Sequence, residues 1–185
     1  MTIKDLFSYR VFTISNFLTF SRIILLFPLW YLVADEEYIN EYRYESLAIA
    51  LAMIATDYFD GFLARKLGQE SALGQYLDPV ADKITILTGL YLMYLKRDYP
   101  LGMLLFVCFR ELYGSFFGIF LLLRRNTLGK PNFWGKTGVF FISISALWYL
   151  MDLPYKWVSD IPVVISLGGG LLAYSFRYGK TIFNP

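Results

Sequence analysis

Six long apolar stretches separated by short polar segments constrain what this chain can fold into. Each is close to the roughly 20 residues that an α-helix needs to cross a bilayer. With 57% hydrophobic residues, 17% charged residues and a mean hydropathy of +0.48, the chain is more apolar than a typical soluble domain. We therefore predict an all-α polytopic membrane protein with six transmembrane helices. The stretches cover residues 16–33, about 46–66, 75–95, from the turn at 96–100 to 123, 135–150 and 159–174.

Residues 1–15 mix polar and apolar side chains in a way that predicts a short interfacial helix rather than a removable signal peptide. Residues 16–185 are then expected to form one membrane domain. Basic residues predict its orientation, because Lys and Arg concentrate on the cytoplasmic side. Ten lie on the N-terminal side (Lys4, Arg10, Arg65, Lys66, Arg124, Arg125, Lys130, Lys136, Arg177 and Lys180) and four on the other (Arg43, Lys96, Arg97 and Lys156). Both termini are therefore predicted to be cytoplasmic.

Four carboxylates interrupt the apolar pattern between the second and third stretches. Asp57 and Asp60 are three residues apart and Asp78 and Asp82 are four apart, so each pair shares one face of a helix. A carboxylate at such a depth costs roughly 2.5–3.5 kcal/mol and needs a partner or a metal. An all-oxygen cage made by the two faces suits Mg²⁺ or Mn²⁺. The chain has no histidine and only Cys108 as a cysteine, which argues against a zinc site and leaves a carboxylate as the natural general base.

Written as a pattern, this region reads D-x2-D-G-x2-A-R-x8-G-x3-D-x3-D. Its fixed positions are Asp57, Asp60, Gly61, Ala64, Arg65, Gly74, Asp78 and Asp82. The pattern closely resembles that of the CDP-alcohol phosphatidyltransferase family, and the six-span layout fits that family too. The competing interpretation is that the aspartates only join helices, paired with Arg65 and Lys83.

The resemblance implies roles for individual residues. Asp57, Asp60, Asp78 and Asp82 would be the metal ligands, and Asp82 would also be the catalytic base that takes a proton from the acceptor hydroxyl. That hydroxyl would attack the β-phosphorus of a CDP-lipid and expel CMP. Residues expected to contact the CDP-lipid are Asn16, Thr19, Asp57, Asp60, Gly61, Ala64, Arg65, Ser71, Gly74 and Asp78. Resemblance also implies a homodimer, and we expect no nucleic-acid partner.

Three weaker features concern the acceptor alcohol. Asn16-x-Leu18-Thr19-x-x-Arg22, Arg110-Glu111 and Gly135-Lys136-Thr137 resemble elements of bacterial phosphatidylglycerophosphate synthases, although the second lysine of the last element is missing. This resemblance implies sn-glycerol 3-phosphate as the acceptor and the bacterial inner membrane as the location. The acceptor's phosphate needs cations, for which Arg110, Lys130 and Lys136 are the candidates.

Several alternatives stay open at this point. Arg110 could simply pair with Glu111, and the loop lysines could only set topology or contact anionic lipids. The acceptor could instead be phosphatidylglycerol, as in a cardiolipin synthase, or inositol phosphate or serine. A cation carrier using the four carboxylates, or a non-catalytic scaffold, is the alternative from another class. Gly168 to Gly170 are expected to allow close helix packing rather than ligand contact.

Overall fold

The structure is a computed structural model of the 185-residue chain, in which residues 14–67, 72–125 and 133–183 are described. All the secondary structure in these ranges is helical, which confirms the all-α prediction for them. The helices are α2 (Ile14–Ala34), α3 (Glu36–Glu41), α4 (Arg43–Leu67), α5 (Ala72–Lys96), α6 (Leu101–Arg125), α7 (Phe133–Leu150) and α8 (Lys156–Phe183). The predicted interfacial helix falls almost entirely outside the described residues.

Each of the six long helices contains one predicted apolar stretch, and α3 is an addition. The predicted apolar stretches leave the residues between 33 and 46 unassigned, because six residues that include three glutamates show no apolar repeat. Asp35 makes this short helix possible. Its carboxylate accepts hydrogen bonds from the backbone N–H groups of Glu37, at 2.8 Å, and Tyr38, at 3.3 Å. These bonds satisfy donors that have no partner within the helix.

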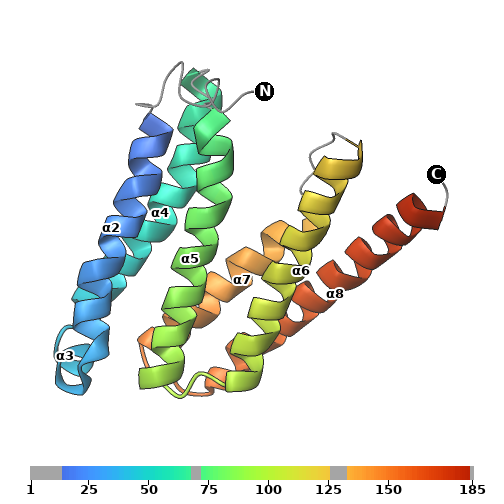
Figure 1. Cartoon of the computed structure of the whole chain (residues 1–185). Coiled ribbons are helices and arrows are strands. Elements are labelled where there is room, and N and C mark those ends of the chain that lie inside the picture. The colour runs from blue at the N-terminus through green and yellow to red at the C-terminus, as the bar shows by residue number, and fades with distance from the viewer. Residues whose placement is uncertain (1–13, 68–71, 126–132, 184–185) are drawn as a thin grey trace. The chain divides into compact units, whose positions relative to one another are not determined.

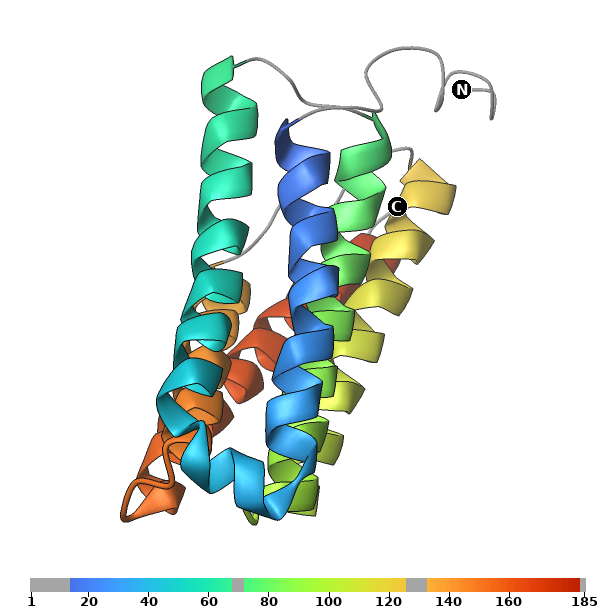
Figure 2. The ribbon, with the colours of Figure 1, turned by 90° about the vertical axis from the view of Figure 1, so that its left-hand side faces the viewer.

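The chain divides into two compact units, Met1–Leu92 and Met93–Pro185. In the first unit α2 packs along α4, and α3 closes the end where α2 finishes and α4 begins (Figure 1). The view in Figure 2 shows α2 with α4 on one side and α5 on the other. Buried apolar side chains of α2, α3 and α4 include Leu26, Leu29, Val33, Ile39 and Met53. The first unit therefore brings α2, α4 and α5, which carry the predicted site, alongside one another.

In the second unit α8 packs against both α7 and α6. Two glycines bring α7 and α8 close together. A Cβ atom added at Gly169 would lie 2.7 Å from Cε3 of Trp134, and one added at Gly138 would lie 2.9 Å from Cδ2 of Leu167. Such distances are too short for carbon atoms, so the absence of a side chain is what permits the contact. The prediction that the glycines of α8 allow close packing is confirmed at Gly169.

A polar network lies between α7 and α8. Asp160 is only 8% exposed. It accepts hydrogen bonds from Ser145 Oγ, at 2.9 Å, and from Tyr149 Oη, at 2.8 Å. Ser159 Oγ in turn donates to Ser145 Oγ at 3.3 Å. Burial of a carboxyl group is costly without such bonds, so these hydroxyls explain why Asp160 is tolerated inside the unit.

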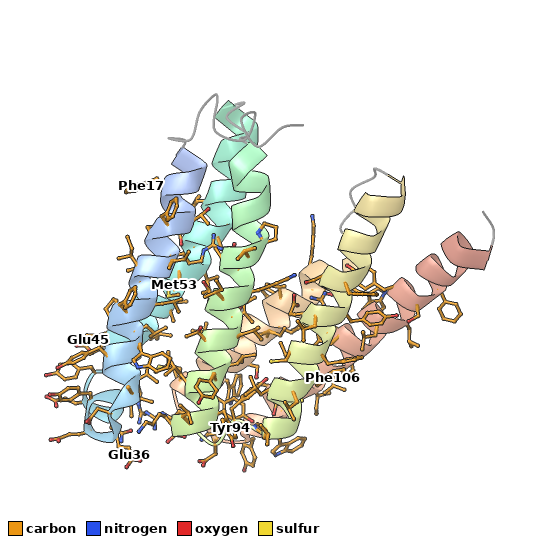
Figure 3. All side chains as sticks on the ribbon, in the orientation of Figure 1. Phe17, Glu36, Glu45, Met53, Tyr94 and Phe106 are labelled. Atoms are coloured by element: carbon orange, nitrogen blue, oxygen red, sulfur yellow. The ribbon has the colours of Figure 1, made fainter. Side chains whose placement is uncertain are left out.

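The outer surface of α2 is apolar. Phe17, Phe20, Ile24 and Phe27 follow one another at three- or four-residue spacing and are all well exposed. Figure 3 shows Phe17 near the start of α2, with Glu36 at the opposite end of the first unit. Within the described residues, two stretches are long and apolar enough to cross a membrane, Phe17–Ala34 and Lys156–Phe176. An apolar outer helix surface of this kind is typical of contact with lipid or with another chain.

Candidate active site

The centre of the candidate site is a meeting of three charged side chains from three helices. Arg22 projects from α2, Asp57 from α4 and Asp82 from α5. Nη1 of Arg22 lies 2.8 Å from Oδ1 of Asp57 and also makes an ion pair with Oδ1 of Asp82. Arg22 is 2% exposed, whereas the two carboxylate side chains are 44% and 39% exposed. Two of the predicted site carboxylates therefore contact the same nitrogen atom of one buried guanidinium group.

The other two aspartates occupy helical positions that match the prediction. Asp60 lies on α4, three residues after Asp57, and Asp78 lies on α5, four residues before Asp82. Their backbone positions therefore share faces with the two carboxylates that meet. The side chains of residues 60–78 lie outside the described set, and so do all atoms of Ser71. The roles predicted for Gly61, Ala64, Arg65, Ser71 and Gly74 accordingly stay predictions.

The donor set has the right chemistry for a hard divalent cation. In the described part of the chain no group of three His, Cys, Asp or Glu side chains gathers around one point. Asp57 and Asp82 nevertheless supply carboxylate oxygens close enough to share one cationic atom, as their common contact with Arg22 Nη1 demonstrates. Oxygen ligands are those that Mg²⁺ and Mn²⁺ prefer. Two carboxylates that share one cation therefore fit a divalent ion, with Asp60 and Asp78 as the predicted completing ligands.

Thr19 and Arg22 are three residues apart on α2 and both are buried at 2% exposure. Thr19 was predicted to contact the nucleotide, while Arg22 was noted only as part of the Asn16-x-Leu18-Thr19-x-x-Arg22 pattern. The signal for Arg22 was present, because a charge inside an apolar span marks a functional position by default. What the sequence could not supply was its partners. The side chain of Asn16, also on α2, lies outside the described set.

The predicted acceptor-binding residues are less well defined. Arg110 of α6 is buried and makes an ion pair with its neighbour Glu111, the pairing that had been weighed as the alternative to an acceptor role. Lys136, near the start of α7, is exposed. Lys130 lies outside the described residues. The acceptor-binding roles of these three residues therefore remain predictions.

Comparison with known proteins agrees with this geometry. A sequence model of the CDP-alcohol phosphatidyltransferase family matches residues 12–172. A CDP-diacylglycerol–glycerol-3-phosphate 3-phosphatidyltransferase of Aquifex aeolicus is 34% identical over 72% of this chain and 73% of its own. The Bacillus subtilis protein of the same name is 30% identical over 80% of this chain and 82% of its own. A CMP-forming cardiolipin synthase of Streptomyces coelicolor is 31% identical over 84% of this chain and 73% of its own.

Proposed function

Because the chain belongs to the CDP-alcohol phosphatidyltransferase family, we propose that it transfers a phosphatidyl group from CDP-diacylglycerol to sn-glycerol 3-phosphate. The products would be phosphatidylglycerophosphate and CMP. The relatives from Aquifex aeolicus and Bacillus subtilis, whose names state this donor and acceptor, support the choice. The structural observation that carries the proposal is the meeting of Asp57 and Asp82 from different helices at one point.

Asp82 acts in this proposal as the general base. It accepts the proton of the acceptor hydroxyl as the hydroxyl oxygen forms a bond to the β-phosphorus, and the bond from that phosphorus to the CMP oxygen breaks. Its partial exposure leaves room for an acceptor to approach the carboxylate. A bound Mg²⁺ or Mn²⁺, held by Asp57, Asp60, Asp78 and Asp82, would neutralise negative charge on the pyrophosphate.

Other residues of α2, α4 and α5 would hold the substrates. Small residues at Gly61, Ala64 and Gly74 would let the nucleotide approach the helix backbone, and Arg65 would offer a planar fork to its oxygens. Asn16, Thr19 and Ser71 are the further proposed nucleotide contacts. A phosphate on the acceptor would be met by Arg110, Lys130 and Lys136.

We further propose that all six long helices cross a bacterial inner membrane, with both termini and the site on the cytoplasmic side. The high content of apolar residues and the distribution of Lys and Arg support this arrangement. Among the described residues, α2 and α8 contain stretches long and apolar enough to cross a membrane, and charged residues of the proposed site lower the hydropathy of α4 and α5. The exposed apolar surface of α2 suits either lipid or the partner of a homodimer.

The name of one relative points to a second acceptor. The Streptomyces coelicolor relative, 31% identical over 84% of this chain, is named a CMP-forming cardiolipin synthase. With phosphatidylglycerol as the acceptor, the same transfer would yield cardiolipin and CMP. The donor, the proposed base and the leaving group would be unchanged, so the two activities differ only in what occupies the acceptor position.

The test is product formation by the purified chain in detergent micelles with CDP-diacylglycerol and Mn²⁺. Glycerol 3-phosphate, phosphatidylglycerol, inositol phosphate and serine are offered separately, and CMP and lipid products are measured by mass spectrometry. We expect product from glycerol 3-phosphate, and a loss of at least about 10²-fold in Asp82→Asn, the scale of general-base catalysis. Asp152→Asn is the matched control, because Asp152 also forms ion pairs but belongs to the second unit.

The outcomes separate the alternatives. Product from phosphatidylglycerol alone would overturn the acceptor and retain the transfer reaction. Full activity in Asp82→Asn would overturn its role as base. If well-folded protein released no CMP with any acceptor, phosphatidyl transfer would be refuted and a cation carrier favoured.

A further inference from the structure

Arg22 occupies the space where the proposed metal ligands meet. Its Nη1 atom lies 2.8 Å from Oδ1 of Asp57 and pairs with Oδ1 of Asp82 as well. We propose that Arg22 is an internal counter-cation, which holds the two carboxylates together in the metal-free protein and must be displaced when a divalent ion binds. This inference rests on the proposed function, since it takes Asp57 and Asp82 to be metal ligands.

The charges favour an exchange rather than joint occupancy. A guanidinium group stays protonated in proteins, so Arg22 cannot leave the site by losing its charge. A divalent ion bound to the same Oδ1 atoms would place two positive centres within a few ångströms of each other. Like charges at that separation repel each other. Binding of the ion therefore requires the Arg22 side chain to move away from Asp57 and Asp82.

The exposed fractions of the three side chains indicate which of them an incoming ion can reach. Arg22 is 2% exposed and reaches the carboxylates from inside the first unit, whereas Asp57 and Asp82 are 44% and 39% exposed. Solvent, and any ion dissolved in it, can therefore reach the two carboxylates while the arginine stays buried. Counted by themselves, the two carboxylates and the guanidinium carry one net negative charge, which favours the approach of a cation.

The proposed exchange predicts whether removal of Arg22 strengthens or weakens the binding of Mn²⁺. When a ligand binds only the molecules in which its site is free, its apparent affinity falls by the fraction that is free. If Arg22 occupies the site in about nine of ten molecules, Mn²⁺ binds about tenfold more weakly than it would without the arginine. Removing the guanidinium should therefore tighten Mn²⁺ binding. A residue that merely arranged the carboxylates for the metal would give the opposite sign, because its loss would weaken binding.

The experiment is a titration of the full chain in micelles with Mn²⁺ alone, followed by the electron paramagnetic resonance signal of the free ion. The proteins are the wild type, Arg22→Gln and Asp57→Asn. Arg97→Gln is the matched control, because Arg97 is also a buried arginine but pairs with Asp152 in the second unit, with 3.6 Å between Nη1 and Oδ2. We expect Mn²⁺ to bind Arg22→Gln about tenfold more tightly than the wild type, and Arg97→Gln like the wild type.

Thermal unfolding supplies a second measurement that does not depend on activity. Without metal, Arg22→Gln should unfold at a lower temperature than the wild type, because the two carboxylates lose their shared cation. Saturating Mn²⁺ should remove most of that difference. Arg97→Gln should also be destabilised, but Mn²⁺ should not rescue it beyond the effect on the wild type. If Arg22→Gln does not fold, Arg22→Lys keeps the charge with a smaller head group and should still tighten Mn²⁺ binding, by a smaller factor.

Failure of this inference is distinguishable from failure of the proposed function. Wild-type binding that Asp57→Asn weakens, together with unchanged or weaker binding in Arg22→Gln or Arg22→Lys, would overturn the counter-cation role and leave the metal site standing. Wild-type binding of Mn²⁺ that is absent, or insensitive to Asp57→Asn, would overturn the proposed metal site and the inference with it.

Discussion

Removal of one hydroxyl, in Tyr149→Phe, tests how the second unit tolerates a buried carboxyl group. Tyr149 Oη donates to Asp160 Oδ2 at 2.8 Å, and Ser145 Oγ donates to the other carboxyl oxygen. The substitution removes the first bond and leaves one carboxyl oxygen buried without that donor. It keeps the aromatic ring, which packs edge-on against Tyr99 with 4.8 Å between ring centroids. The loss of stability should therefore come from the hydrogen bond alone.

The size of the effect follows from the charge and the burial. Hydrogen bonds between membrane helices average about 0.6 kcal/mol, but a bond to a charged group contributes about 1.5–3 kcal/mol. Because Asp160 is only 8% exposed, water cannot replace the lost donor. We therefore expect Tyr149→Phe to lower the free energy of unfolding by about 1.5–3 kcal/mol. Tyr155→Phe, which removes the same atom from a residue that is 73% exposed, should change it by less than about 0.5 kcal/mol.

The assay is reversible unfolding of the purified chain in mixed micelles, with Tyr149→Phe measured again in an Asp160→Leu background. Without the carboxyl group the tyrosine hydroxyl has lost its acceptor, so the cost of Tyr149→Phe should shrink to below about 0.5 kcal/mol. An equal cost in both backgrounds would mean that the hydroxyl acts through something other than Asp160. A cost no larger than that of Tyr155→Phe would refute the reasoning altogether.

Three further predictions follow from local geometry. Gly169→Ala should lower the free energy of unfolding by about 1–3 kcal/mol, because the new Cβ atom would clash with Trp134. In the matched control Gly168→Ala, the new Cβ atom meets no atom within 4 Å, so this change should be neutral or stabilising. Equal effects of the two substitutions on the free energy of unfolding would contradict the packing. Asp35→Ala should destabilise α3 by about 0.5–2 kcal/mol, seen as faster hydrogen exchange over residues 36–41, with Asp35→Asn close to the wild type. Burial, followed by the charge of Asp160, raises the pKa of Tyr99, so its contribution to stability should be complete below pH about 10 and fall as the pH rises further. Tyr99→Phe should flatten that decline above pH about 10, and an unchanged slope would contradict the burial of its hydroxyl.

The six long helices could be predicted because their apolar character is a local property of the sequence. Each predicted stretch lies inside one helix, and most helices exceed the stretches by a few residues at their ends. The exception in length is α8, which continues to Phe183, nine residues past the predicted end. The sequence also indicated that Asp57 and Asp60, and likewise Asp78 and Asp82, share helix faces, because their spacing repeats with the turn of a helix.

Contacts between distant residues could not be predicted in the same way. Arg22 and Asp82 are 60 residues apart, so their pairing depends on how α2, α4 and α5 pack, and no periodicity encodes that. Asp160 is a similar case. Serine and tyrosine are ordinary residues in an apolar stretch, and their convergence on Asp160 depends on the turn between α7 and α8. The short helix α3 was missed because its stability comes from the cap at Asp35 rather than from a hydrophobic pattern.

The position of the donors around Asp160 has a consequence for how the chain is made. Ser145 and Tyr149 precede Asp160 by 15 and 11 residues and belong to the neighbouring helix of one hairpin. When a ribosome delivers α8, the hydroxyls that its carboxyl group needs are therefore already synthesised. If α7 and α8 cross the membrane as proposed, this hairpin can enter the bilayer with its acidic side chain already hydrogen-bonded.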